Sequence, residues 1–140
     1  MLPSPYAAPE GAARAGRLLE LSERLAESGR RGEALDAARE ACQVLRDLAQ
    51  LDSGTYLPDL AEGLSVMAAR LREARRMREG VTAAQETVRI RRRLTRYDYD
   101  AHASGLARAL CRLAVDLSAS GDLRDALASA QESVDLYRGL

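Results

Sequence analysis

Residues 117–140 read LSASGDLRDALASAQESVDLYRGL, and the same pattern occurs twice upstream. The earlier copies are LREARRMREGVTAAQETVRIRRRL at residues 71–94 and LAESGRRGEALDAAREACQVLRDL at residues 25–48. The three copies follow one another at equal intervals of 46 residues, so they align without a gap. A fixed period of this length is typical of a protein built from stacked repeats.

The alignment extends upstream of the quoted stretches, and each full copy contains two apolar stripes with helical spacing. In the third copy, Leu110, Leu113 and Leu117 are three and four residues apart, which places them on one face of a helix. Leu127 and Val134 belong to a second stripe that begins after a short break. Each copy is therefore expected to form two amphipathic helices.

The break between the two stripes contains a helix stop in two of the copies. Ser28-Gly29 and Ser120-Gly121 occupy it in the first and third copies, and glycine commonly ends a helix. Asp122 is then expected to cap the next helix. The second copy has Ala74-Arg75 instead, so its turn lacks the residue that adopts a positive φ most easily.

Small residues recur where the two helices of a copy would touch. They are Ser22, Ala68 and Ala114 on the first helix and Ala38, Ala84 and Ala130 on the second. Small side chains let helices approach closely, so each copy is expected to form an antiparallel hairpin. One hairpin cannot bury its apolar face alone, whereas three stacked hairpins form a continuous core.

This pattern resembles the tetratricopeptide repeat over about residues 10–140. In the third copy the resemblance rests on Leu110, Leu113, Ala114, Leu117, Gly121, Ala126, Leu127 and Ala130. The unit is longer than the family's usual length of about 34 residues. It is similar to the long-helix units of kinesin-light-chain-type and actinobacterial arrays. The resemblance implies an all-α fold: an α-solenoid of three antiparallel helical hairpins, wound as a right-handed superhelix.

Proline, glycine and capping signals predict the boundaries. Residues 1–9 hold three of the four prolines and are expected to be a flexible tail, followed by a single domain at residues 10–140. The expected repeats span about residues 10–50, 57–96 and 101–140. The expected helices span about residues 10–28, 31–50, 57–74, 77–96, 101–120 and 122–140. Linkers are expected at residues 51–56 and 97–100, with Pro58 in a first helical turn and Asp100 as an N-cap.

The charge balance excludes some classes of partner. The chain has 140 residues, with 21 basic residues, all arginine, and 21 acidic residues. Its formal net charge of zero does not favour nucleic acid or a membrane surface, and no apolar run approaches the roughly 20 residues of a membrane span. Arginine without lysine, together with abundant alanine, indicates a GC-rich bacterial genome. Residues 1–9 lack the regions of a signal peptide, so the cytoplasm is the expected location.

The sequence gives no sign of an enzyme or a cofactor. Cys42 and Cys111 fit neither a disulfide framework nor a metal site. Cys42 aligns with Val88 and Val134 and is expected to pack in the core, whereas Cys111 is expected on the groove side. His102 is the only histidine and is expected near a linker, without a serine–histidine–aspartate set, metal spacing or phosphate loop. We therefore expect no catalysis, no cofactor and no metal.

The family resemblance implies a binding groove on the concave side. In tetratricopeptide arrays, the first helix of each hairpin lines a surface that holds a peptide or helix of a partner protein. The matching residues are Leu19, Glu23, Ala26, Glu27, Glu62, Ser65, Ala69, Arg72, Glu73, Arg108, Cys111, Val115, Ser118 and Ala119. The alternative is that they are ordinary solvated positions of a structural array.

The third repeat is expected to leave an apolar edge uncovered. This edge consists of Leu123, Leu127, Tyr137 and Leu140. Three interpretations are compatible with this apolar edge: the chain self-associates through it, a partner covers it, or the chain is a fragment of a longer array.

A basic stripe is expected on the fourth helix, where Arg89, Arg92, Arg93 and Arg96 share one face. Such a stripe can bind phosphates or an acidic partner. No aromatic residues interleave with it and the chain is neutral, so nucleic acid is the less favoured partner.

Together these features predict a protein–protein interaction module, an adaptor or scaffold. Its partner would occupy the concave groove or the C-terminal edge. One alternative is a homo-oligomeric structural element, such as a homodimer through the C-terminal repeat. Another is an arginine-dependent binder of acidic or nucleic-acid partners, whose affinity would fall steeply with salt.

Overall fold

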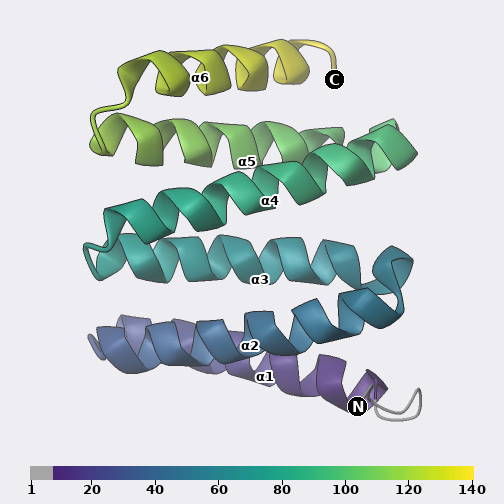
Figure 1. Cartoon of the computed structure of the whole chain (residues 1–140), viewed down its shortest axis with the longest axis vertical. Helices are drawn as coiled ribbons and strands as arrows, with labels where there is room; N and C mark the ends of the chain where they lie inside the picture. Colours follow the sequence, from purple (N-terminus) through teal and green to yellow (C-terminus); the bar gives the residue numbers. More distant parts are fainter. Residues whose placement is uncertain (1–7) are drawn as a thin grey trace.

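Six α-helices follow one another in a computed structural model that describes residues 8–140 (Figure 1). They are α1 (Ala8–Glu27), α2 (Arg31–Leu51), α3 (Ser53–Glu73), α4 (Met77–Tyr97), α5 (Tyr99–Ala119) and α6 (Leu123–Arg138). These residues contain no strand, which confirms the all-α class. Figure 1 shows the helices stacked in chain order, with connections that alternate between the two sides of the stack.

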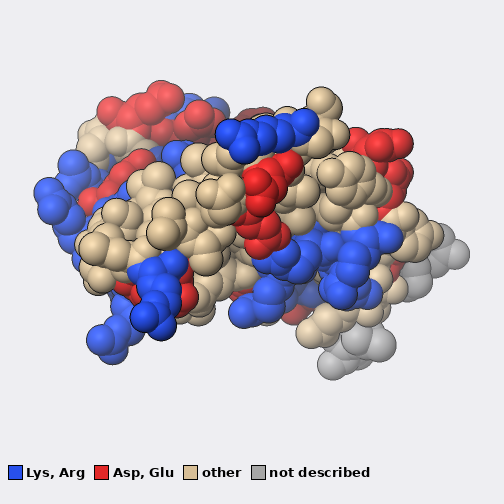
Figure 2. Space-filling model, turned by 90° about the horizontal axis from the view of Figure 1, so that it is seen from above, with Lys and Arg blue, Asp and Glu red and all other residues tan. Residues whose placement is uncertain are grey.

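Packing is mostly between helices that are neighbours in the sequence. Each of α2 to α5 packs against the helix before it and the helix after it, whereas α6, among the described helices, packs extensively against α5 alone. This arrangement is compatible with a helical repeat. At the α6 end of the stack, uncharged residues form a broad exposed area (Figure 2).

The predicted apolar stripes form much of the core. Leu64, Leu71, Leu110 and Leu117 are buried, as are five of the six small residues, namely Ser22, Ala38, Ala68, Ala84 and Ala114. Two buried hydroxyls link neighbouring helices. The hydroxyl of Ser22 donates to the carbonyl of Ala34 at 2.7 Å, and that of Ser133 donates to the carbonyl of Ala107 at 2.7 Å. Small polar residues therefore allow close approach and also fix α1 against α2 and α5 against α6.

The linker expected at residues 51–56 is wrong. Only Asp52 separates α2 from α3, and its carboxylate accepts a hydrogen bond from the backbone N–H of Thr55 at 3.2 Å. This bond satisfies one of the free N–H groups at the helix start, so α3 begins at Ser53 rather than at Leu57. Pro58 consequently lies inside α3, beyond its first turn.

The second linker is also shorter than expected. Asp98 alone separates α4 from α5, and its carboxylate accepts from the backbone N–H of Ala101 at 3.2 Å. The N-cap is therefore Asp98, and the expectation that Asp100 serves this role is wrong. In both connections a single capping aspartate replaces a loop of several residues.

The turns inside the repeats follow the glycine pattern of the sequence. Gly29 and Gly121 adopt φ values of 80° and 84°, and Arg75 adopts a φ of 63° at the matching position of the second copy. Asp122 precedes α6, but its side chain makes no capping hydrogen bond, so the expected cap is not formed.

The start of α1 differs from the expected tail at residues 1–9. Ala8 and Pro9 already belong to the helix, and residues 1–7 lie outside the described part of the chain. Within residues 8–140, no helix has both the length and the apolar character needed to cross a bilayer.

Candidate functional site

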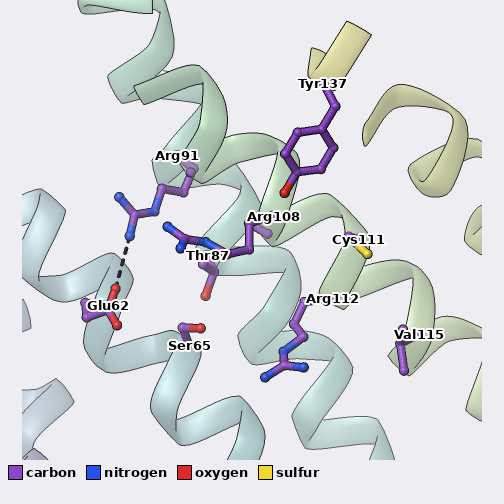
Figure 3. Close-up of a pocket in the computed structure, with 11 residues that line it drawn as sticks. Glu62, Ser65, Thr87, Arg91, Arg108, Cys111, Arg112, Val115 and Tyr137 are labelled. Carbon is purple, nitrogen blue, oxygen red and sulfur yellow. Dashed lines mark hydrogen bonds and ion pairs between the residues drawn. The ribbon is translucent and has the colours of Figure 1, made fainter. Parts of the chain in front are cut away.

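A pocket of about 410 Å³ opens between α3 and α5, with side chains of α4 and α6 completing its walls. The residues that line it are Glu62, Ser65, Thr87, Arg91, Gly105, Arg108, Ala109, Cys111, Arg112, Val115 and Tyr137. Figure 3 shows Arg91, Arg108 and Arg112 reaching into this space, with Glu62 and Ser65 on one side. The pocket therefore gathers five predicted groove residues (Glu62, Ser65, Arg108, Cys111 and Val115) and adds residues from the second helices.

The charge of the pocket is positive. Arg91, Arg108 and Arg112 all line it, whereas Glu62 is the only carboxylate among its lining residues. The Nη2 atom of Arg91 lies 3.4 Å from an Oε atom of Glu62, and the side chain of Glu62 is itself 66% exposed. Elsewhere in residues 8–140, no carboxylate lies within ion-pair distance of Arg108 or Arg112. Of the three cations, only Arg91 has an ion pair among the described residues, and that pair is long and solvated.

Arg91 is held in a partly desolvated position. Its side chain is 14% exposed, and a Cβ atom added at Gly105 would lie 3.4 Å from its Nη1 atom. Burial lowers the pKa of Arg91 most, the Glu62 carboxylate raises it, and the Arg108 charge lowers it further. Arginine nevertheless stays protonated in proteins. A partly buried cation with so little compensation favours the approach of an anion.

Arg91 reaches the pocket because it occupies an aligned position that is part of the core in the first copy. The 46-residue period aligns it with Leu45, which is buried in the core, and with Tyr137 of α6. A long polar side chain therefore stands where the first copy has a leucine. Sequence reasoning missed this residue because it considered the neighbouring arginines as a stripe. An arginine at an aligned core position was the signal that could have found it.

The rest of the lining combines hydroxyls with apolar surface. The hydroxyl of Thr87 donates to the carbonyl of Ala83 at 2.9 Å, which leaves its oxygen free to accept. Ser65 is half-buried, and Val115 is exposed on the opposite wall. A ligand with an anionic head and a short apolar stem would match this combination.

Arg72, a predicted groove residue, is used for structure instead. Its Nε and Nη2 atoms donate to the two carboxylate oxygens of Asp116 at 2.6 and 3.4 Å. The side chain of Asp116 is only 3% exposed, so this pair ties α3 to α5. Sequence reasoning missed Asp116, although a carboxylate within the apolar segment from Leu113 to Leu117 was a signal that it needed a partner.

The remaining groove candidates do not gather in the pocket. Glu23 and Glu27 are exposed on α1, and Ser118 is exposed near the end of α5. Glu73 lies 3.3 Å from Arg70 of its own helix. The structure therefore divides the predicted groove into a basic pocket and scattered surface positions.

The edge candidates Leu123, Leu127, Tyr137 and Leu140 are all exposed large apolar residues, and Val134 joins them. All five lie in α6 or just after its last residue, Arg138. Tyr137 also lines the pocket, so the pocket and the exposed side of α6 meet at this residue.

The two cysteines occupy different environments. Cys42 is buried among Leu45, Leu48 and Leu64, and burial raises the pKa of its thiol to about 12, so it stays protonated. Its packing role is as predicted. Cys111 is exposed at the pocket.

The basic stripe of α4 is partly engaged, because Arg92 pairs with Glu132 of α6. Arg89, Arg93 and Arg96 are exposed.

His102, which the sequence placed near a linker, lies within α5 and lines a second cavity of about 530 Å³ together with Pro58. No three His, Cys, Asp or Glu side chains within residues 8–140 gather so as to hold a metal ion.

Neither of two comparisons with known proteins gives a match from which a function could be transferred. A scan against protein-family models finds none that matches the chain. A search of curated proteins likewise finds no match. The function has to be inferred from the residues of the pocket and of the exposed helix faces.

Proposed function

We propose that this chain is a tetratricopeptide-like array, an α-solenoid of three antiparallel helical hairpins, and that it works as a protein–protein interaction module. Three features support the array: the gap-free period of 46 residues, packing between consecutive helices, and positive φ values at the three matching turns. Aligned positions of the copies then lie at equivalent places within their hairpins.

The pocket between α3 and α5 holds an acidic segment of the partner protein. The observation that carries this function is the convergence of Arg91, Arg108 and Arg112 with Glu62 as the sole carboxylate. Charge-assisted bonds from a guanidinium to a carboxylate are among the stronger hydrogen bonds in proteins. An aspartate or glutamate side chain therefore fits this site better than a neutral or basic one.

Binding of a labelled glutamate decamer to the full chain tests the proposal, with a glutamine decamer as the neutral comparison. Replacing both Arg108 and Arg112 with glutamine is expected to weaken binding by about tenfold or more, because one charge-assisted hydrogen bond contributes about 1.5 kcal/mol or more. Circular dichroism should show unchanged helicity, since neither arginine has a carboxylate partner in the described residues.

A matched control removes the same charge elsewhere. Arg31 and Arg78 are exposed at the starts of α2 and α4, so the Arg31→Gln/Arg78→Gln variant should bind the decamer within about twofold of the unaltered chain. Equal losses in both double variants would show diffuse attraction rather than a pocket. A single-stranded oligonucleotide that binds more tightly than the decamer, with a steep salt dependence, would favour the nucleic-acid alternative.

A further inference from the structure

One side of α6 is an exposed copy of a surface that is covered elsewhere in the stack. Leu127 is 71% exposed, whereas Leu35, its counterpart in α2, is 3% exposed. Val134 is 42% exposed, whereas its counterpart Cys42 is 2% exposed. In α2 these positions face α3, so α6 presents the surface on which a following helix would pack.

A series of ion pairs indicates what that following element carries. Arg46 of α2 pairs with Glu86 of α4, and Arg92 of α4 pairs with Glu132 of α6. Both pairs are bidentate, and each joins one copy to the next with the same separation of 40 residues. The next arginine of the series is Arg138, which is exposed at the end of α6. It has no carboxylate partner among residues 8–140.

The opposite end of the stack is closed to the same kind of contact. Glu40, the first glutamate of the series, pairs with Arg14 of its own hairpin. The period aligns Arg14 with the buried Leu60, and Arg17 with Gly63. A Cβ atom added at Gly63 would lie only 3.1 Å from Leu45 of the preceding helix, so an arginine in that position could not approach α6 closely. Stacking of α1 of a second copy on α6 is thus disfavoured by both charge and shape.

We infer that the exposed side of α6 docks a helical hairpin of another protein. The first helix of that hairpin carries leucines four residues apart, with a small residue between them, as α3 does at Leu60, Gly63 and Leu64. Its second helix carries a glutamate that pairs with Arg138, as Glu86 pairs with Arg46. The inference rests on the proposed array but not on the pocket, because none of the three pocket arginines belongs to α6.

The test uses the full chain and a defined probe, a peptide with the sequence of residues 53–97, which supplies the sequence of α3–α4 with Glu86 available. Because one hairpin cannot bury its apolar face alone, the probe is expected to become helical as it binds. Labelled probe is titrated with the full chain and followed by fluorescence anisotropy. Saturable binding is expected, and Leu127→Asp in the full chain should abolish it because a charge would then be buried in the contact. Tyr97→Asp, at an exposed residue on α4, is the matched control and should leave binding unchanged.

Charge exchange tests the assigned register. Arg138→Glu should weaken binding severalfold, and a probe with Glu86→Arg should restore the affinity for that variant while binding less well to the unaltered chain. Absence of probe binding, or no recovery in the exchanged pair, would overturn the proposal.

The absolute mass of the full chain, measured by light scattering over a range of concentrations, decides whether a second copy is the occupant. A monomer is expected at all concentrations. A dimer that Leu127→Asp dissociates would make a second copy the occupant and overturn the proposal. The decamer experiment on the pocket reads out different side chains, so the two proposals fail independently.

Discussion

α2 and α6 occupy matching places in two copies of the repeat, yet one is enclosed and the other is open. Both helices have an apolar residue at the position of Leu35 and Leu127 and an arginine at the position of Arg46 and Arg138. In α2 the leucine is buried by the following helices and the arginine is paired, whereas in α6 both are exposed. The same residue therefore stabilises the fold or remains available for a partner according to its place in the stack.

The largest difference in stability is expected between alanine substitutions of Leu35 and Leu127. Leu35→Ala should lower the free energy of unfolding by about 2–5 kcal/mol, because it leaves a cavity against Leu71 and Ala68. Leu127→Ala should change it by less than about 0.5 kcal/mol, because this side chain is largely exposed. Urea unfolding of both variants measures the difference. A comparable loss in both would mean that α6 is already covered in solution, for instance by a second copy.

The pocket side offers a second contrast, between a used and an unused arginine. Arg72→Ala should destabilise the chain by about 2–4 kcal/mol, because it leaves the buried carboxylate of Asp116 without its partner. Arg108→Ala should cost less than about 0.5 kcal/mol. Thermal unfolding separates the two cases, and a tolerated Arg72→Ala would show that the pair with Asp116 is not maintained in solution.

The turns inside the repeats should respond in opposite directions. Arg75→Gly should stabilise the chain by up to about 1 kcal/mol, because it relieves a left-handed conformation that costs an L residue about 1–2 kcal/mol, while glycine loses more chain entropy. Gly121→Ala, in the turn before α6, should destabilise by about 1 kcal/mol for the converse reason. Denaturant midpoints of the two variants test this, and a shift in the same direction for both would contradict it.

The paired and unpaired arginines should differ by a smaller amount. Arg46→Ala should cost about 0.2–1 kcal/mol through loss of its pair with Glu86, which is only partly buried. Arg138→Ala should have no measurable effect on the unfolding of the isolated chain. Added salt should narrow the gap between the two variants, since exposed pairs are screened. A cost at Arg138 equal to that at Arg46 would indicate a partner already in place.

The smallest effect concerns the aspartates that precede α3 and α6. Hydrogen bonds from Thr55 lower the pKa of Asp52 in the folded chain. Its stabilising contribution is therefore complete above the pKa of the unfolded state and is lost as the pH falls through the lowered folded pKa. Asp52→Ala should reduce the thermal midpoint at neutral pH, and the reduction should fade in acid. Asp122→Ala, which removes no capping bond, should leave the thermal midpoint at neutral pH nearly unchanged.

The sequence predicted the all-α class, and the packing of consecutive helices is compatible with the predicted repeat, because both depend largely on the spacing of apolar residues. Apolar residues with helical spacing, such as Leu64, Leu71 and Leu110, are buried as expected, and the turns at Gly29 and Gly121 adopt positive φ. The two linkers were misjudged for a local reason. One hydrogen bond donated by a free backbone N–H group to an aspartate carboxylate is enough to start the next helix, and residue composition does not reveal that bond.

The candidate site was less predictable because it depends on which charged side chains find partners. Arg72 and Arg108 looked equivalent in the sequence, and only the three-dimensional position of Asp116 separates them. Arg91 could have been noticed through its alignment with Leu45, but its convergence with Arg112 requires the crossing of α4 and α5. Spacing within one helix indicates which face is apolar, whereas distances between helices decide which cations share a pocket.

Packing between consecutive helices also affects the order in which the molecule opens. α6 is held extensively by one neighbour, so its amide hydrogens should exchange with solvent sooner than those of α3 or α4, which are held on both sides. Local opening of α6 would also remove Tyr137 from the wall of the pocket. A molecule that docks on α6 would slow this exchange and keep the pocket wall in place, so occupancy of one surface would be transmitted to the other as a change in local stability.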